Sequence, residues 1–300
     1  MIAEGMPLFS ILIANYNNGR YLQEALDSVF RQTCQNWEVI LVDDASTDGL
    51  SELIYQKYTD PDSSDFDPRI RVFHNDGNHG CGYTKRRCAE LAQGELCGFL
   101  DPDDALTENA VEVMVREHKQ HPEVSLVAAR YWCADENLKP LWLSREFQNI
   151  PGRSFLTDEI HNALVFSSFK TAMYRQTAGI NPVLKRAVDM DLYFRLEEVA
   201  PFLYLSLSIY IYRMYAGGIS QGNMKAQYWH ILAIKDAAER RGIEAENIVD
   251  MQLRHGEDCL RKELNNIKAS RYYRLGYALI HPWERVYRKL TKIWRSIKNK

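Results

Sequence analysis

The sequence predicts an α/β fold in which a mostly parallel, mixed sheet is flanked by helices and followed by a C-terminal helical extension. Short apolar runs alternate with segments of helical apolar spacing through residues 9–129, a rhythm typical of parallel sheets. Polar loops follow the first, second and fourth of these runs. The chain has 300 residues, 46% of them hydrophobic, which suffices for a large core without disulfide staples.

The individual elements follow from the spacing of apolar residues and from the turn residues that bound them. Unbroken apolar runs predict buried strands, and apolar residues three and four positions apart predict helices. The predicted strands cover residues 9–14, 37–42, 70–73, 96–100 and 124–129. The predicted helices cover residues 21–30, 53–58 and 109–119, and the stretch between Gly82 and Gln93.

The pattern becomes less regular after residue 130. Apolar pieces at residues 141–143, 163–166 and 172–174 have no clear helical partners between them, so we expect an irregular subdomain there. A helix is predicted over residues 189–198, strand structure over 202–213 and polar helices over 223–268.

Three polar loops are expected to converge at one edge of the sheet. They cover residues 15–18, 43–48 and 101–104, and each follows a predicted strand. Right-handed crossovers place the ends of successive parallel strands on the same edge, which is where open α/β sheets bind ligands.

The third of these loops carries three carboxylates, Asp101, Asp103 and Asp104, in the segment FLDPDD. Charges this close repel one another, so a cation is expected to compensate them. Hard oxygen ligands suit Mg²⁺ or Mn²⁺, which combine one or two carboxylates with substrate phosphates. A solvated acidic turn is the alternative, because Asp and Pro are common turn residues.

Composition limits the class of protein and its compartment. The six cysteines have no CxxC pair or zinc-finger spacing, which favours reduced structural thiols. No stretch has the length of a transmembrane helix, and the N-terminus lacks the pattern of a secretory signal. We therefore expect a cytoplasmic protein.

The C-terminal tail differs in charge from the rest of the chain. Residues 261–300 contain twelve Lys and Arg against two Glu, and aromatic residues are interleaved among them. Because the whole chain carries a formal net charge of −3, residues 1–260 carry −13. This tail favours attachment to an anionic membrane surface. A helix pair packed on the body is the alternative, and nucleic acid is not expected because the body is acidic.

The segments SILIANYNN, VILVDDASTDG and FLDPDD, in this order, resemble the inverting family 2 glycosyltransferases. The resemblance covers about residues 7–220. It implies a GT-A type fold that uses a nucleoside-diphosphate sugar, with a UDP-sugar as the expected donor. We then expect a GT-A domain over residues 1–222, with a nucleotide-binding half (1–129) and an acceptor-side half (130–222), and an extension over 223–300.

The resemblance also implies roles for matching residues. Nucleotide contacts are expected from Asn15, Tyr16, Asp44, Arg86, Asp101 and Arg213, with Tyr16 packing on the base and Asp44 accepting a hydrogen bond from it. Asp44 could instead hold the turn at residues 46–49. Within the basic cluster at residues 85–87, Arg86 or Arg87 is expected near the diphosphate and the others in solvent. Asp103 is the first choice as ligand of Mn²⁺ or Mg²⁺ in this DxD motif, with Asp101 and Asp104 as further candidates.

The segment AVDMDLYFRL resembles the part of the family that carries the catalytic base. Asp189 matches that base, while Val188 stands where the family usually has Glu. Asp191 is interpreted as a helix N-terminal acid, since residues two apart on a helix point to different sides. The segment YRMYAGGIS retains Arg213 but has Tyr215 where related enzymes often carry a histidine.

These observations predict an inverting hexosyl- or N-acetylhexosaminyl-transferase. It would act on a glycan or lipid-linked acceptor in cell-surface polysaccharide synthesis, as a peripheral protein on the inner face of the cytoplasmic membrane. A catalytically inactive nucleotide-sugar binding module is the alternative, and a homodimer is left open. Neither GxGxxG nor a P-loop motif occurs, which counts against dinucleotide and P-loop enzymes.

Overall fold

The computed structural model describes residues 5–144, 146, 154–157, 166–215, 224–244, 246, 248 and 268. The strands are β1 (Phe9–Asn15), β2 (Trp37–Asp43), β3 (Ile70–His74), β4 (Leu96–Phe99), β5 (Ala105–Leu106), β6 (Leu126–Ala134), β7 (Pro140–Leu143), β8 (Phe166–Lys170) and β9 (Phe202–Arg213). The helices are α1 (Gly19–Phe30), α2 (Leu50–Thr59), α3 (Cys81–Leu91), α4 (Ala110–Gln120), α5 (Thr171–Tyr174), α6 (Val188–Glu197) and α7 (Met224–Arg240). All of them belong to a compact unit, residues 1–245; residues 246–300 form a second unit.

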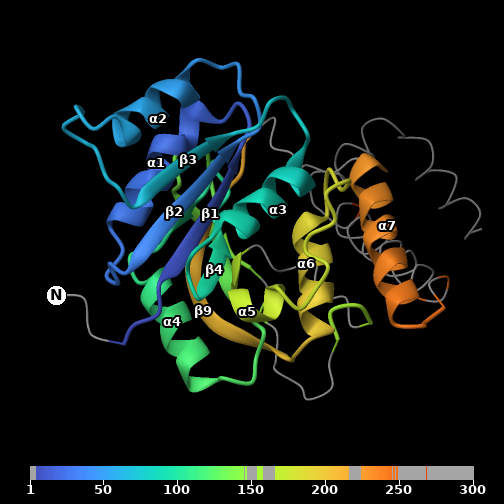
Figure 1. Cartoon of the computed structure of the whole chain (residues 1–300). Coiled ribbons are helices and arrows are strands. Elements are labelled where there is room, and N and C mark those ends of the chain that lie inside the picture. Colours follow the sequence, from blue (N-terminus) through green and yellow to red (C-terminus); the bar gives the residue numbers. More distant parts are fainter. Residues whose placement is uncertain are drawn as a thin grey trace, which may run out of the picture. The chain divides into compact units, whose positions relative to one another are not determined.

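One sheet organises this unit, with the strand order β3-β2-β1-β4-β8-β6-β9-β5 and with β7 paired to β6 (Figure 1). The strands β3, β2, β1 and β4 are parallel neighbours. Asn15 and Asp43, the last residues of β1 and β2, are partners in the register. The three polar loops therefore follow adjacent strands, which confirms their expected convergence at one edge.

The central strands are buried because helices cover them. Every residue of β2 is buried, as its continuous apolar run predicts. Helix α3 packs on β1 and β2, and both α4 and α6 contact β6. Gly98 of β4 lets the sheet pack closely, since a Cβ there would lie 2.9 Å from the ring of Phe9.

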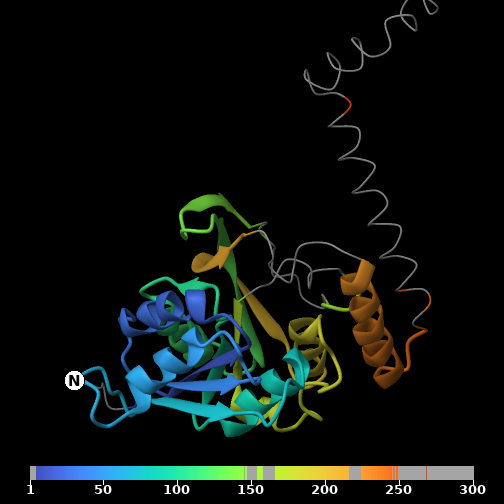
Figure 2. The same ribbon diagram turned by 90° about the horizontal axis from the view of Figure 1, so that it is seen from above.

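The second half of the sheet is less parallel than the first. Strand β8 is antiparallel to both β4 and β6, while β9 pairs parallel with β6 and antiparallel with β5. The β6–β7 hairpin, drawn in green, extends beyond the rest of the sheet in Figure 2. The mixed sheet with flanking helices agrees with the predicted fold class.

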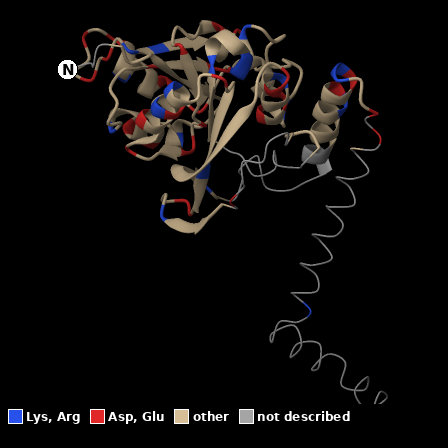
Figure 3. Ribbon diagram, turned by 90° about the horizontal axis from the view of Figure 1, so that it is seen from below, with Lys and Arg blue, Asp and Glu red and all other residues tan. Residues whose placement is uncertain are grey.

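Charge is distributed differently in the described body and in the tail. Acidic and basic stretches are interspersed over the described part of the ribbon (Figure 3). Apart from Lys268, the basic tail at residues 261–300 lies outside the described residues. Every helix in the described part is too short or too polar to span a lipid bilayer.

Candidate active site

The acid turn, residues Asp101–Asp104, follows β4 and presents its carboxylates in different ways. Asp104 is buried, and its carboxylate accepts hydrogen bonds from the Tyr210 hydroxyl (2.7 Å) and the Arg213 backbone N–H (2.7 Å). Burial and the neighbouring charge of Asp103 raise the pKa of Asp104 well above its usual range. Asp104 therefore holds the turn, while the side chain of Asp101 keeps 37% of its surface exposed.

Asp103 lies beside a tyrosine. The Tyr215 hydroxyl donates a hydrogen bond to Asp103 Oδ2 (3.0 Å), and the Tyr215 ring packs against Tyr21 with 4.9 Å between centroids. Burial, followed by the charge of Asp101, raises the pKa of Asp103. Tyr215 thus occupies the place beside the acid turn where the family resemblance led us to look for a histidine.

The guanidinium of Arg213 binds groups of the protein itself. Its Nε donates to the backbone oxygen of Asp103 (2.6 Å), and its other nitrogens reach the backbone oxygen of Glu136 and the carboxylate of Glu24. The side chain is fully buried against the Tyr21 ring. These contacts give Arg213 the task of fixing the acid turn, and its expected contact with a diphosphate stays a prediction.

Lys85 supplies the cation that the acid turn requires. Its Nζ lies 3.0 Å from Asp101 Oδ1 and 2.8 Å from Asp189 Oδ1, and only 6% of its side chain is exposed. Burial disfavours the charge, but the two carboxylates outweigh it and raise the pKa of Lys85 well above its usual range. The expectation that Lys85 is solvated was wrong, because two acids distant in sequence compensate its charge.

The other two cations of the cluster point elsewhere. Arg86 donates to the Glu90 carboxylate (2.7 Å) and to the backbone oxygen of Ile180 (3.2 Å). Arg87 reaches the side-chain oxygen of Asn75. None of these three contacts involves the acid turn, so the role of Arg86 at a diphosphate stays a prediction.

Asp189 is brought to this site by close packing of α3 against the chain before α6. The Gly82 N–H donates to the Leu184 backbone oxygen (2.9 Å), and a Cβ on Gly82 would lie 2.4 Å from that oxygen. This contact needs glycine. It allows the first turn of α6 to approach α3 (Figure 1). The carboxylate of Asp189 then contacts the ammonium of Lys85.

Asp191 lies in the first turn of α6 and points to a different side from Asp189, as the spacing of two residues predicts. Its side chain is fully buried, pairs with Arg195 (2.9 Å) and accepts the Asn181 backbone N–H (2.8 Å). Of the two acids in this turn of α6, only Asp189 reaches the edge.

The loop after β1 combines a buried amide with an exposed ring. The Asn15 side-chain Nδ2 donates to the hydroxyls of Tyr55 (2.6 Å) and Ser51 (2.9 Å), which ties β1 to α2. Its buried Oδ1 has no hydrogen-bond partner among the described residues. Tyr16 follows with 45% of its surface exposed, so its ring is available to a ligand.

Asp44 connects the end of β2 to the loop before α3. Its buried carboxylate accepts from the Asn75 side chain (2.7 Å) and from the backbone N–H groups of His79 (2.9 Å) and Gly80 (2.8 Å). The turn at residues 46–49 is held instead by Asp43, which accepts the backbone N–H of Ser46 (2.9 Å). The alternative, that Asp44 holds the turn at residues 46–49, was therefore wrong, because Asp44 holds the loop before α3. The contact of Asp44 with a nucleotide base stays a prediction.

The acid turn fits a hard divalent cation that takes part of its ligands from a substrate. Asp101 and Asp103 both have one carboxylate oxygen engaged by a protein donor, which leaves one oxygen each. No group of three or more His, Cys, Asp or Glu side chains within the described residues could hold a metal. Mg²⁺ and Mn²⁺ suit such a site, because they retain waters and bind phosphate oxygens.

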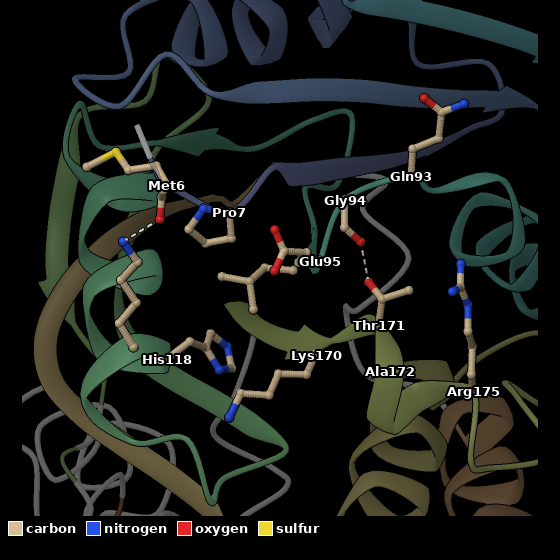
Figure 4. A pocket seen from close by; sticks show the side chains of 13 residues that line it. Met6, Pro7, Gln93, Gly94, Glu95, His118, Lys170, Thr171, Ala172 and Arg175 are labelled. Atoms are coloured by element: carbon tan, nitrogen blue, oxygen red, sulfur yellow. Dashed lines mark hydrogen bonds between the residues drawn. The ribbon is translucent and has the colours of Figure 1, made fainter. Parts of the chain in front are cut away.

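A hollow of about 670 Å³ lies away from this chemistry. It is lined by residues before β1 and at the start of β4, which is the opposite edge of the sheet from the acid turn. His118 and Lys170 lie on one side of it and Arg175 on the other (Figure 4). The site residues predicted from the sequence do not line it.

A model of glycosyl transferase family 2 matches residues 10–179. The chain is a member of glycosyl transferase family 2. The matched range includes β1 from its second residue, β2, the acid turn and α3, and ends before α6 and β9.

Curated relatives include proteins that are named for the synthesis of polysaccharides. The chain is 28% identical over 247 residues to a chondroitin synthase of Pasteurella multocida and 27% identical over 243 residues to one of Escherichia coli. These matches cover 81% and 80% of this chain but only 24% and 34% of those proteins. A putative colanic acid biosynthesis glycosyl transferase of Escherichia coli is 32% identical over 200 residues, 63% of this chain and 66% of that protein.

Solved structures support the fold. TarS residues 1–349 of S. aureus superimpose with a TM-score of 0.64 at 19% identity, covering 89% of this chain and 76% of that chain. The same residues of TarS in complex with UDP-GlcNAc give a TM-score of 0.64 at 20% identity, covering 90% and 75%. The family 2 chain thus has the predicted GT-A type fold.

Sequence reasoning missed residues that organise the site from outside its motifs. Lys85, Tyr210 and Asn75 each engage an acid of a strand-end loop. The signal for Lys85 was the charge of the acid turn itself, which required a cation. Tyr210 and Asn75 carry no comparable signal, because their partners are set by the pairing of distant strands.

Proposed function

We propose that this chain is an inverting glycosyltransferase. It moves a hexosyl or N-acetylhexosaminyl group from a UDP-sugar to a hydroxyl of a glycan or glycolipid in cell-surface polysaccharide synthesis. The observation that carries the proposal is that Asp189 and Asp101 both form salt bridges with the ammonium of Lys85. It puts a half-exposed carboxylate beside the edge where a nucleotide would bind.

The relatives support the class of substrate. Chondroitin synthases and a colanic acid transferase are named for polysaccharides, and TarS has been crystallised with UDP and with UDP-GlcNAc. Synthesis of a polysaccharide is what the names of the chondroitin and colanic acid relatives share. Attachment to the inner face of the cytoplasmic membrane through residues 261–300 is part of the same proposal.

The reaction needs a base on the side of the acceptor. Asp189 would take the proton of the acceptor hydroxyl while the acceptor oxygen forms a bond to C1 of the sugar. The bond between C1 and the diphosphate oxygen breaks, and UDP leaves with the electron pair. Attack from the side opposite to the leaving group inverts the configuration at C1.

The remaining residues would bind and orient the donor. Tyr16 offers an exposed ring for the base, and Asn15 and Asp44 line the same edge. Arg86 and Arg213 are the further candidates for nucleotide contacts. The loops after adjacent parallel strands are where such ligands bind.

The free oxygens of Asp101 and Asp103 would hold Mn²⁺ or Mg²⁺, which stabilises the charge on a departing diphosphate when bound. Asp104 would act through the turn, because both of its oxygens already accept hydrogen bonds. Burial, followed by the charges of neighbouring carboxylates, raises the pKa values of Asp103 and Asp104.

The base assignment is tested by Asp189→Asn. We expect transfer from a UDP-sugar to fall about 1,000-fold, since a positioned base contributes factors of this size, while UDP binding measured by calorimetry stays within threefold. Asp62→Asn, an exposed acid in the loop after α2, is the matched control with unchanged transfer. Product configuration is read by NMR.

Three outcomes would contradict parts of the proposal. Full transfer by Asp189→Asn rules out this residue as the base. Retention of configuration rules out the single displacement. UDP binding by the wild type without turnover on any glycan acceptor favours the inactive binding module, for which Val188 in place of the family's Glu is the supporting feature.

A further inference from the structure

The ammonium of Lys85 joins two carboxylates that come from distant parts of the chain. Asp101 belongs to the turn after β4, and Asp189 belongs to the first turn of α6, 104 residues from Lys85. The lysine side chain is 6% exposed, whereas those of Asp101 and Asp189 are 37% and 39% exposed. The cation therefore reaches both acids from beneath the surface, and each acid keeps an open side.

The backbone that carries Lys85 is held in place on several sides. The Thr84 hydroxyl donates to the Gly80 backbone oxygen (3.0 Å) and accepts from the Asn75 side chain (3.2 Å). The Gly82 N–H is bonded to Leu184 (2.9 Å). The backbone position of Lys85 is therefore fixed. Because both Oδ1 atoms contact Nζ, at 3.0 Å and 2.8 Å, the ammonium holds the two carboxylates close to each other.

This geometry leaves the working atoms of both acids available. Each carboxylate gives Oδ1 to the ammonium, and no donor within the described residues reaches Oδ2 of Asp189. One positive charge shared by two carboxylates leaves a net negative charge at the site. The two carboxylates take two of the three ammonium N–H groups, and a side chain that is only 6% exposed leaves little of the third for a diphosphate.

We propose that Lys85 is a positioning residue of the transfer reaction, which ties the base Asp189 to Asp101 of the acid turn and so sets the base against the donor. The inference rests on the proposed function. Its consequence is that removal of the ammonium impairs the chemical step more than donor binding, because the two halves of the site lose their common reference.

The test compares Lys85→Met with Lys119→Met, the same substitution on an exposed lysine of α4 whose Nζ bonds to Gly5. We expect kcat of Lys85→Met to fall about 100-fold, because misplacement of a catalytic group by an ångström costs about this factor. The KM for the UDP-sugar should stay within threefold. Lys119→Met should behave as the wild type. Lys85→Arg, which keeps the charge, should have a kcat about tenfold higher than that of Lys85→Met.

A double variant separates positioning from an independent role. If Lys85 acts through Asp189, then Lys85→Met combined with Asp189→Asn is no slower than Asp189→Asn alone, since effects within one unit are not additive. The midpoints of thermal unfolding of the same four proteins give a second measure of the coupling. The double variant should lose less than the sum of the two single losses.

The opposite results overturn the inference. Additive losses in the double variant, or a raised donor KM with unchanged kcat, would make Lys85 a ligand-binding residue that acts independently of the base. Lys85→Met could fail to fold, and Lys85→Arg then carries the test. A folded Lys85→Arg that is as inactive as Lys85→Met in lysate would also count against the inference, because a positive charge at this position would then be insufficient to position the base. Absence of transfer by the wild type overturns the proposed function, and the inference with it.

Discussion

At the scale of single residues, each acid of the turn after β4 has a partner of a different kind. Asp101 meets the ammonium of Lys85, Asp103 meets the phenol of Tyr215, and Asp104 meets a phenol and a backbone N–H. Burial increases along the same order, from a half-exposed side chain to a fully enclosed one. The three carboxylates lie within four residues of sequence and are nevertheless not equivalent as ligands.

The tyrosine beside Asp103 gives a prediction at this scale. Tyr215→His would replace the phenol beside Asp103 by a shorter imidazole, and imidazole is a good ligand of transition metals. We expect the Mn²⁺ concentration that gives half-maximal transfer to fall about tenfold. The measurement is a metal titration of activity, with Tyr215→Phe as the control that removes the hydroxyl alone. An unchanged Mn²⁺ requirement would place the metal away from Tyr215.

At the scale of elements, the first turn of α6 separates two acids by function. Asp189 is 39% exposed and faces α3, whereas Asp191 is fully buried and paired with Arg195. Arg195 continues the contact to Asp236 of α7 (2.8 Å), so this pair also connects two helices. The same turn thus serves the site on one side and the packing of α6 and α7 on the other.

Substitution of these two acids should lower the stability of the protein by unequal amounts. Asp191→Asn leaves Arg195 without its buried partner, and we expect the free energy of unfolding to fall by about 3 kcal/mol. Asp189→Asn should cost about 1 kcal/mol or less, because its side chain is partly solvated and Lys85 keeps Asp101. Urea unfolding measures both. Equal losses in the two variants would contradict the division of roles.

How far sequence reasoning reached depends on the element. Strands β1 and β2 could be predicted because continuous apolar runs bury both of their faces. β8 has two serines at its centre, and its strand form comes from pairing with β4 and β6. The direction of the Lys85 side chain could not be predicted. Residues 85–87 are all cationic, and which of them faces the site depends on where α6 packs against α3.

At the scale of the whole molecule, a buried histidine links the fold to pH. His118 of α4 is 4% exposed, and its Nε2 lies 3.0 Å from the Ser168 hydroxyl of β8. Burial, with a smaller contribution from the charge of Lys170, lowers the pKa of His118 to about 3 from a usual 6.5. The folded protein therefore keeps this ring neutral where the unfolded chain would protonate it.

The sign of the pH dependence follows from this difference. Below pH 6.5 the unfolded chain binds a proton that the folded protein does not, so stability is complete above pH 6.5 and falls as the pH decreases toward 3. The contribution at pH 5 is a loss of about 2 kcal/mol. We expect His118→Gln to remove this part of the difference between urea unfolding at pH 7.5 and pH 5, with His121→Gln as the control. An unchanged difference in His118→Gln would show that the ring is solvated.

Strand β9 ties the acid turn to the far side of the sheet. It pairs with β6 from Phe202 to Arg213 and with β5 at Tyr210 and Ile211, and its last part supplies the Tyr210 hydroxyl and the Arg213 N–H to Asp104. A fragment that ends at residue 129 would be cut within β6 and would lack these donors. The two halves of this enzyme are therefore not interchangeable modules, and recombination with a relative's acceptor half has to carry matching residues on β9 to keep the donor half folded.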